Sequence, residues 1–317
     1  MSTPRPLAWV VGAGGLVGRH VAAELAAAGH DVMTSTIPWD DETAAVRVLG
    51  EEAGRFATAR AGRDWVLAWC AGAGVVATGE EALAAEGRVF SAALDRVAAD
   101  VGPDEQGVLF LASSAGGLYA GSADPPFSED TEPRPLVPYG RVKLRMEDDL
   151  RAVVGATGLR AVIGRLANVY GPGQRLGKPQ GLLSQLCLAD ATGTPLPVFV
   201  SMDTIRDYVH VADVARMVVR SIQLARDEPA GSAVVKVLAS GTPVTVGHLV
   251  GEARRVFHRP LRTIPVAGGR GQVLDLRMRS VRWPEVDALA STTLAAGLAD
   301  TAADVRARVV SGGPLDG

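Results

Sequence analysis

Hydrophobic residues gather in short runs along the first half of the chain, and a stretch with helical spacing follows each run. After the apolar run at 7–13, apolar residues recur every three or four positions as far as Gly29. The same alternation predicts further strands at 30–36, 65–70, 107–114 and 159–166, and helices near 40–59, 80–100 and 140–157. Apolar strands that alternate with helices are typical of a parallel sheet covered on both faces. The pattern predicts an α/β fold with a doubly wound parallel sheet.

The pattern loosens after about residue 170. Residues 171–181 form a glycine- and proline-rich loop, a helix is expected in the second part of 205–225, and a strand at 232–240. We therefore expect two domains. The larger would combine 1–170 with 207–240, and a smaller C-terminal lobe would combine 171–206 with 241–317.

Composition narrows the class of protein. The 317 residues are 47% hydrophobic and carry a net charge of −3, with no long run of one sign, which disfavours nucleic acid as a partner. Two cysteines make no disulfide framework, and no run of apolar residues is long enough to span a membrane. We expect a cytoplasmic protein. The five histidines are scattered without ligand-like spacing, so no metal site is predicted.

A glycine motif follows the first predicted strand. Gly12, Gly15 and Gly18 stand at the spacing G-x-x-G-x-x-G, and a helix follows at once through Leu16 and Val17. Glycine tolerates unusual φ angles and leaves room for a pyrophosphate, while the helix presents free N–H groups and the positive end of its dipole. In this context the motif indicates a dinucleotide site.

The residue at the end of the second strand bears on the choice of cofactor. An acidic residue there binds the ribose hydroxyls of NAD, but counting along the strand places Thr36 at this position. Threonine does not repel a 2′-phosphate, which favours NADP. No arginine follows directly, since the next residues are Ile37, Pro38 and Trp39. NAD therefore stays open as the alternative.

Tyr139 and Lys143 form the most specific pair in the sequence. They are four residues apart and share one helix face, and Lys143 is one of only three lysines in the chain. A tyrosine with a pKa of about 10 is a poor acid or base at neutral pH. A nearby ammonium favours the phenolate and lowers that pKa, and lysine's compact head can also reach a cofactor ribose. The alternative interpretation is an exposed tyrosine beside a solvated lysine.

These features together resemble the short-chain dehydrogenase/reductase superfamily and, within it, the extended branch of NAD(P)-dependent nucleotide-sugar epimerases and dehydratases. The resemblance rests on five motifs in the family's order, namely the Gly12–Gly18 motif, LFLASSAGGLYAG, PLVPYGRVKLRMEDDL, GRLANVYGPGQ and IRDYVHVADVAR. It implies a Rossmann-type fold with a dinucleotide-binding domain and a smaller C-terminal substrate lobe. It also implies a homodimer that joins through helices including the one that starts at Tyr139.

The resemblance also implies roles for single residues. Tyr139 would be the catalytic acid/base, Lys143 would bind the nicotinamide ribose, and a serine or threonine would polarise the substrate. Asn168 and Arg206 would contact the substrate's diphosphate. The alternatives for these two residues are a turn asparagine and a surface ion pair of Arg206 with Asp203 or Asp207.

The chain departs from the family pattern at the serine. Counting four residues back from Tyr119 gives Ala115, so Ser114 is the expected catalytic serine, with Ser113 as the reserve. The acidic pair of the sugar dehydratases is replaced by Ala-Gly-Gly, which disfavours 4,6-dehydration. Ala71 and Gly72 follow the third strand, and we expect both to pass close to the cofactor.

Several functions share these parts. The leading hypothesis is an NAD(P)-dependent nucleotide-sugar 4-ketoreductase that uses Tyr139 as acid/base. The main competing hypothesis is an NAD-dependent 4-epimerase, which would show no net consumption of cofactor. A third hypothesis is a catalytically silent protein that senses the cofactor and binds a partner. A fourth is a reductase of small carbonyl compounds without a nucleotide.

Overall fold

The computed structural model describes residues 4–72, 79–102, 107–177, 181–258, 261–266 and 273–312. These residues fall into two compact units. The first unit comprises the described residues within Met1–Ser122, Thr131–Leu166 and Ala215–Val237. The second comprises those within Ala123–Asp130, Ala167–Val214 and Leu238–Gly317. Among the described helices, none is both long and apolar enough to cross a membrane.

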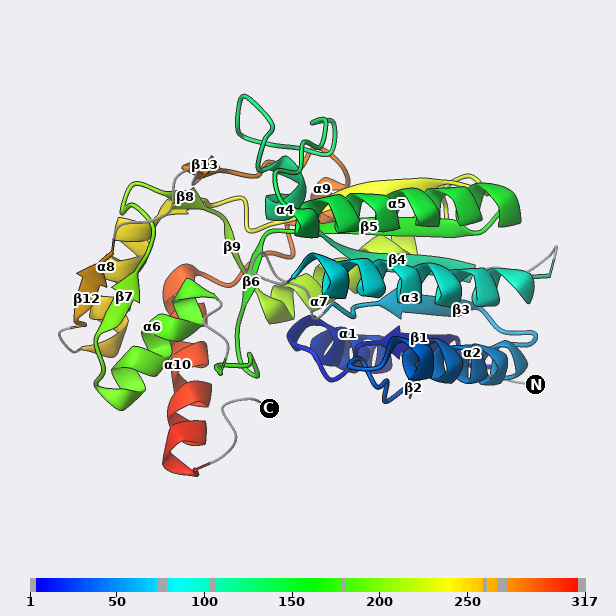
Figure 1. Cartoon of the computed structure of the whole chain (residues 1–317), viewed down its shortest axis with the longest axis horizontal. Helices are drawn as coiled ribbons and strands as arrows, with labels where there is room; N and C mark the ends of the chain where they lie inside the picture. Colours follow the sequence, from blue (N-terminus) through cyan, green and yellow to red (C-terminus); the bar gives the residue numbers. More distant parts are fainter. Residues whose placement is uncertain are drawn as a thin grey trace. The chain divides into compact units, whose positions relative to one another are not determined.

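A six-stranded sheet in the order β10-β5-β4-β3-β1-β2 forms the centre of the first unit (Figure 1). Neighbouring strands from β2 to β5 pair in parallel. Its strands are β1 (Leu7–Val11), β2 (Asp31–Thr34), β3 (Trp65–Trp69), β4 (Gly107–Ser114), β5 (Arg160–Leu166) and β10 (Ala233–Leu238). The doubly wound α/β prediction is confirmed. Strand β1 has β2 on one side and β3 on the other. The order of the strands therefore reverses between β1 and β3.

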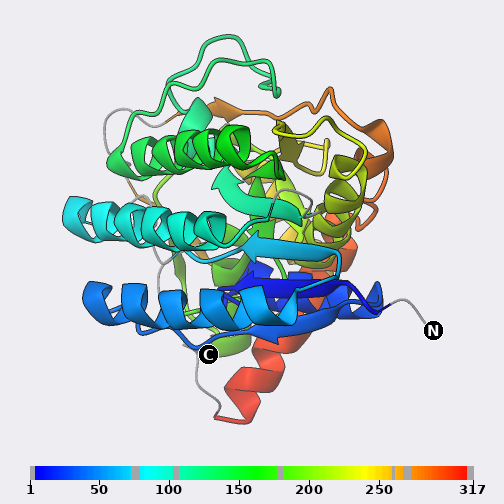
Figure 2. The ribbon, with the colours of Figure 1, turned by 90° about the vertical axis from the view of Figure 1, so that its right-hand side faces the viewer.

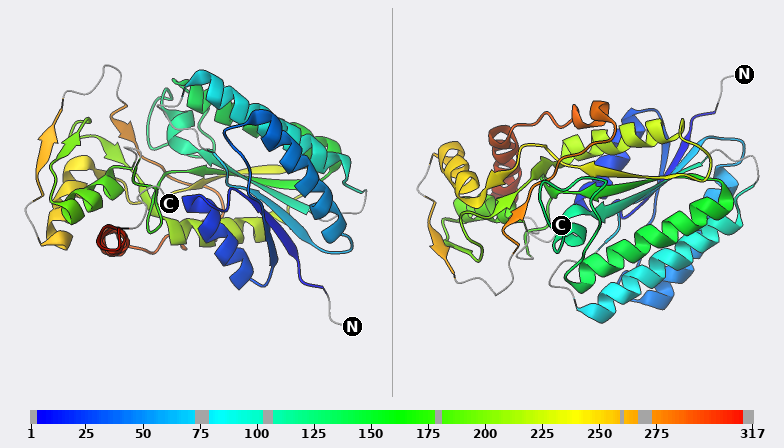
Figure 3. Two further views of the ribbon diagram at one scale, coloured as in Figure 1. Left: turned by 60° about the horizontal axis from the view of Figure 1, so that its bottom comes forward. Right: turned by 90° about the horizontal axis from the view of Figure 1, so that it is seen from above.

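Helices cover both faces of this sheet. On one face α2 (Glu42–Ala59), α3 (Glu80–Ala99) and α5 (Pro138–Thr157) lie side by side, as Figure 2 shows. The other face carries α1 (Leu16–Ala27) and α7 (Val211–Ala225), as seen in Figure 3. The core between the sheet and the first group includes Trp9, Phe56, Trp65 and Phe90, all nearly inaccessible to solvent.

Local signals set the ends of these helices. Asp41 caps α2 by accepting a hydrogen bond from the Ala44 amide. Pro138 is the first residue of α5, where its missing N–H costs nothing, and Gly158 ends the helix with a φ of 73°. The short helix α4 (Ala115–Tyr119) directly follows β4 and is capped by Ser114. Ser114 and Tyr139 thus both lie at helix starts, where side chains are placed by the backbone.

The second unit is built from small sheets and helices. Three short sheets have the orders β11-β8-β13, β12-β7 and β6-β9. The strands are β6 (Asn168–Tyr170), β7 (Leu196–Val198), β8 (Ile205–Arg206), β9 (Tyr208–His210), β11 (Val244–Thr245), β12 (Thr263–Pro265) and β13 (Asp275–Leu276). The helices are α6 (Leu182–Thr192), α8 (Val246–Phe257), α9 (Pro284–Asp287) and α10 (Leu294–Val310). Helices α6, α8 and α10 pack on one another around an apolar core.

Candidate active site

The loop after β1 has a backbone that only glycine fits. Gly12 has a φ of 88°, and a Cβ there would stand 2.5 Å from the Ala71 backbone nitrogen. A Cβ on Gly18 would lie 2.2 Å from the Gly12 carbonyl oxygen. The Gly15 amide closes the turn by donating to that same oxygen at 2.9 Å. The glycines therefore permit both the turn and the close approach of the β3 end to the β1 end.

The first turn of α1 leaves its amides without a side-chain partner. Gly15 stands at the cap position with no capping side chain, and no acidic residue occupies the first turn. The N–H groups of Leu16 and Val17 lie at this positive helix end. Arg19 adds a cation here and donates to the carbonyls of Gly14 and Gly15 at 2.9 and 3.3 Å. These residues fit the diphosphate of a dinucleotide.

Thr36 is exposed and lies two residues beyond the end of β2. The preceding Ser35 is already engaged, because its hydroxyl accepts from the Trp9 indole at 3.0 Å and donates to Glu52 at 3.0 Å. The Glu52 carboxylate also accepts from Arg55 at 2.7 Å. The strand thus ends two residues earlier than predicted, and Thr34, Ser35 and Thr36 at and after its end are all neutral.

Lys143 is buried one helical turn after Tyr139 on α5. Its ammonium lies 6.0 Å from the centre of the Tyr139 ring and 2.8 Å from Glu86 Oε1 on α3. Burial acts to lower the pKa of Lys143, but the charges of Glu86 and Tyr139 and the Glu86 hydrogen bond outweigh it, so the pKa lies above its ordinary value. The lysine is therefore charged at neutral pH. No sequence spacing connects Glu86 with Lys143, and sequence reasoning missed this residue.

Gly72 packs directly against this ion pair. A Cβ at this position would stand 3.1 Å from Lys143 Nζ and 3.2 Å from Glu86 Oε1. The preceding Ala71 is buried and faces Gly12. Ala71 and Gly72, the second and third residues after β3, thus lie against the glycine loop and the Lys143–Glu86 pair respectively.

The two candidate serines have different surroundings. Ser113 is buried, and its hydroxyl donates to Glu147 Oε1 at 2.6 Å. Ser114 Oγ instead accepts from the Gly117 amide at 3.1 Å, which leaves its own proton available to a further acceptor. A Cβ on Gly117 would meet the Tyr139 ring at 3.0 Å and Ser114 Oγ at 3.2 Å. Ser114 and Tyr139 therefore border the same space, whereas the Ser113 hydroxyl is occupied elsewhere.

A buried ion pair holds the elements that carry these side chains. Arg165 on β5 binds Glu147 on α5 through two hydrogen bonds of 3.1 and 2.7 Å, and Glu147 is fully buried. The Arg165 guanidinium also donates to the Tyr119 hydroxyl at 2.7 Å. This network links α4 and β5 to α5, the helix that carries Tyr139.

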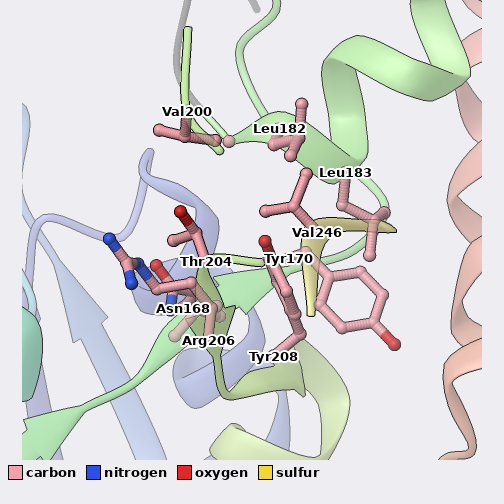
Figure 4. A pocket seen from close by; sticks show the side chains of 11 residues that line it. Asn168, Tyr170, Leu182, Leu183, Val200, Thr204, Arg206, Tyr208 and Val246 are labelled. Carbon is pink, nitrogen blue, oxygen red and sulfur yellow. The ribbon is translucent and has the colours of Figure 1, made fainter. Parts of the chain in front are cut away.

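Asn168 and Arg206 line one pocket, which lies entirely within the second unit (Figure 4). The pairing of β6 with β9 sets Asn168 beside Tyr208, two residues from Arg206. The pocket has a volume of about 180 Å³, and Figure 4 shows the two predicted residues opposite the apolar Leu182 and Leu183. Its full lining is Asn168, Val169, Tyr170, Gly181, Leu182, Leu183, Val200, Thr204, Arg206, Tyr208 and Val246.

The polar groups of this pocket are partly engaged by the backbone. Among the described residues, Arg206 donates to the carbonyls of Ile205 and Val273 at 2.8 Å each rather than to a carboxylate. Burial lowers the pKa of Arg206, yet an arginine stays charged at any physiological pH. Burial raises the pKa of Tyr208 to about 12, so it remains a neutral hydroxyl. The pocket thus combines a fixed cation, neutral donors and apolar walls, a combination suited to an anion attached to an organic group.

The sequence is similar to those of known proteins. The model of the NAD dependent epimerase/dehydratase family matches residues 8–237. The chain is 29% identical over 142 residues to dTDP-4-dehydro-6-deoxyglucose reductase of Escherichia coli. The matched segment is 45% of this chain and 43% of the reductase. The chain therefore spans less than half the length of that curated relative.

Solved structures show the same fold over the whole length. UDP-glucose 4-epimerase of Thermotoga maritima with UDP-glucose is similar with a TM-score of 0.80 and 20% identity, over 96% of this chain and 99% of that one. RMD of Pseudomonas aeruginosa complexed with NADPH has a TM-score of 0.72 and 20% identity, over 96% of this chain and all of that one. Because the family model covers most of the chain, including the glycine loop and the Tyr139–Lys143 pair, the chain belongs to the NAD dependent epimerase/dehydratase family.

Proposed function

We propose that this protein is an NAD(P)-dependent oxidoreductase that reduces the C4 keto group of a nucleotide-activated sugar. The observation that carries the proposal is the buried, charged Lys143 one turn after Tyr139, with the Ser114 hydroxyl bordering the same space. A tyrosine beside an ammonium suits proton transfer to and from a sugar oxygen.

The first unit is the proposed dinucleotide-binding domain. Gly12, Gly15 and Gly18, with the Leu16 and Val17 amides, would hold the diphosphate, and Thr36 would lie at the adenosine ribose. Ala71, Gly72 and Lys143 would border the nicotinamide half. Bound NAD(P)H supplies the hydride that reduces the sugar carbon. The neutral Thr36 supports NADP as the preferred cofactor, with NAD as the alternative.

Tyr139 would donate its hydroxyl proton to the C4 oxygen as that oxygen gains negative charge. Lys143 then stabilises the phenolate that remains, because an ammonium favours the ionised form. Ser114 would donate to the same oxygen, since its own acceptor site already takes the Gly117 amide. A positioned donor of this kind contributes by binding charge that develops in the transition state.

The second unit is the proposed substrate lobe. Arg206 and Asn168 would bind the diphosphate of the nucleotide sugar, and the apolar walls of the pocket would hold its organic part. The E. coli reductase acts, by its name, on a dTDP sugar, and the T. maritima epimerase structure holds UDP-glucose. These relatives support a nucleotide sugar over a small carbonyl compound. By family resemblance we also propose a homodimer that forms through helices including α5.

The second candidate is a nucleotide-sugar 4-epimerase, which the fold similarity to UDP-glucose 4-epimerase supports. It would use the same residues twice, first to oxidise and then to reduce on the other face. A 4,6-dehydratase is not proposed, because the residues after Ser114 are Ala115, Gly116 and Gly117 and offer no acid or base.

The first experiment replaces the proposed acid/base. Tyr139→Phe should lower kcat by about 10² to 10⁴ while the dissociation constant of the cofactor stays close to that of the wild type. Cofactor binding is measured by fluorescence titration and turnover with 4-keto nucleotide sugars. If turnover survives in Tyr139→Phe, the mechanism is wrong. If the wild type shows no turnover but binds cofactor and a partner protein, the protein is a silent sensor.

A second variant tests the class of substrate. Arg206→Gln can still donate to neighbouring carbonyls but lacks the charge, so KM for a nucleotide sugar should rise at least about tenfold. Arg220→Ala, which removes an exposed arginine of α7, serves as the control and should leave KM unchanged. An unchanged KM in Arg206→Gln would favour a substrate without a diphosphate.

A further inference from the structure

Lys143 is paired with a carboxylate from another helix, and among the described residues this is its only ion pair. Glu86 on α3 lies 57 residues earlier in the chain, and its Oε1 atom accepts from Lys143 Nζ at 2.8 Å. The two side chains are only 5% and 9% exposed. The pair is therefore formed away from water, where charge interactions are strong and an unpaired ion is costly.

The surroundings leave the Lys143 ammonium little freedom. The Gly72 backbone covers the pair so closely that an added Cβ would come within 3.2 Å of both charged groups. The Met146 sulfur lies 3.9 Å from Nζ on the α5 side. Within the described part of the chain, Glu86 and Tyr139 are the charged or titratable groups that act on this lysine.

An ammonium has three donors in a compact, rotatable head, so it needs an anchor to hold one direction. Glu86 engages one donor and leaves the other two for different partners. The carboxylate also offsets the desolvation of the ammonium, which would otherwise favour its neutral form.

We propose that Glu86 is a positioning residue that keeps the Lys143 ammonium charged and directed towards Tyr139 and the nicotinamide side of the cofactor site. The inference rests on the role of Lys143 in the proposed function. It adds a residue from α3 to the site, so that a change on this helix would alter the acid/base chemistry of α5.

Lysine titration by NMR tests the proposal directly, because the chain has only three lysines. Full-length protein is labelled at the lysine Cε and Nζ, and Lys143→Arg assigns the Lys143 signal. In Glu86→Gln the pKa of Lys143 should fall by at least about one pH unit relative to the wild type. The matched control is Glu81→Gln, which alters an exposed glutamate of the same helix and should leave the titration unchanged.

The activity provides a second readout that a purely structural role would not move. Only the charged lysine fulfils the proposed role, and a lower pKa means that this charge is lost at lower pH. The basic limb of the kcat profile should therefore move to lower pH in Glu86→Gln and stay in place in Glu81→Gln. An unchanged Lys143 titration in Glu86→Gln overturns the proposal, whatever the activity.

If Glu86→Gln does not fold, Glu86→Asp tests the proposed effect of Glu86 on the pKa of Lys143. It keeps the charge but withdraws the carboxylate by one methylene, so the pKa of Lys143 should still fall, by less. No change in this variant would also overturn the proposal. If instead the wild type turns over no nucleotide sugar while the Lys143 pKa falls as stated, the proposed function fails and the Glu86 pairing stands.

Discussion

At the scale of single residues, Gly117 lies between the Tyr139 ring and the Ser114 hydroxyl, the two proposed catalytic side chains. Its amide donates to the Ser114 hydroxyl oxygen, and its missing side chain leaves room for the Tyr139 ring. A methyl group there would press on the ring at 3.0 Å, closer than carbon atoms normally approach. The position of Tyr139 thus depends on the absence of a side chain on α4.

We predict that Gly117→Ala displaces Tyr139 and lowers kcat by about tenfold or more, because small misplacements of a reacting group are costly. The control is Gly155→Ala on the exposed side of α5, where a Cβ would meet nothing within 4 Å. That change should leave kcat unaltered and add about 0.5–1 kcal/mol of stability. Steady-state kinetics and thermal unfolding measure both effects. Equal kcat values in the two variants would contradict the prediction.

The residue spacing predicted part of this site. Tyr139 and Lys143 share a helix face because four positions make about one turn. The structure shows in addition that Lys143 is buried and paired with Glu86. The contacts of Lys143 with Glu86 on α3 and of Ser113 with Glu147 in the middle of α5 could not be predicted, because tertiary packing makes them. The spacing of residues within one helix can be read from the sequence. The choice between Ser113 and Ser114 depends on contacts between elements, which cannot.

At the scale of elements, the Glu147–Arg165 pair fixes α5 to β5. Glu147 accepts from Arg165, Ser113 and also Arg151, so its carboxylate is fully satisfied although it is buried. A satisfied buried ion pair holds its elements in one arrangement, and losing one partner leaves the other uncompensated.

Glu147→Gln should therefore lower the free energy of unfolding by about 3–5 kcal/mol, because it leaves the Arg165 charge buried without its counter-charge. The neighbouring Asp148 is 66% exposed and pairs with Arg151, so Asp148→Asn should cost less than about 1 kcal/mol. Urea denaturation of both variants compares the two costs. Similar losses in both would show that the buried pair does not hold α5.

The elements differ in how far the sequence predicts them. The apolar runs gave the main strands of the first unit, because a buried parallel strand has to be apolar on both faces. Strands of two or three residues, such as β8 and β11, carry no usable periodicity. The segment Ala123–Asp130 joins the second unit through hydrogen bonds of Phe127 with Arg277 and Arg279, a pairing about 150 residues apart in sequence that no local pattern contains.

At the scale of the whole molecule, the proposed cofactor and substrate residues divide between the two units. The glycine loop belongs to the first unit, and the pocket with Arg206 belongs to the second. We expect each ligand to stabilise the protein through its own residues. At about 100 times its dissociation constant, a ligand should add about 2.7 kcal/mol.

Two variants crossed with two ligands test this division. Gly12→Val places a side chain against the Ala71 backbone, so NADP⁺ should no longer raise Tm, while UDP still should. Arg206→Gln should abolish the effect of UDP and keep that of NADP⁺. Thermal shift assays read out all four combinations. If either variant loses the response to both ligands, the assignment of separate sites fails.

The most direct measurement of the proposed reaction is cofactor consumption with a 4-keto nucleotide sugar, followed by the absorbance of the reduced nicotinamide. We predict that wild-type protein oxidises one NADPH for each sugar reduced, faster than it uses NADH, and that Tyr139→Phe does so at least about 10²-fold more slowly. Conversion of a nucleotide sugar into its C4 epimer without net consumption of cofactor would contradict the ketoreductase account and identify the protein as an epimerase.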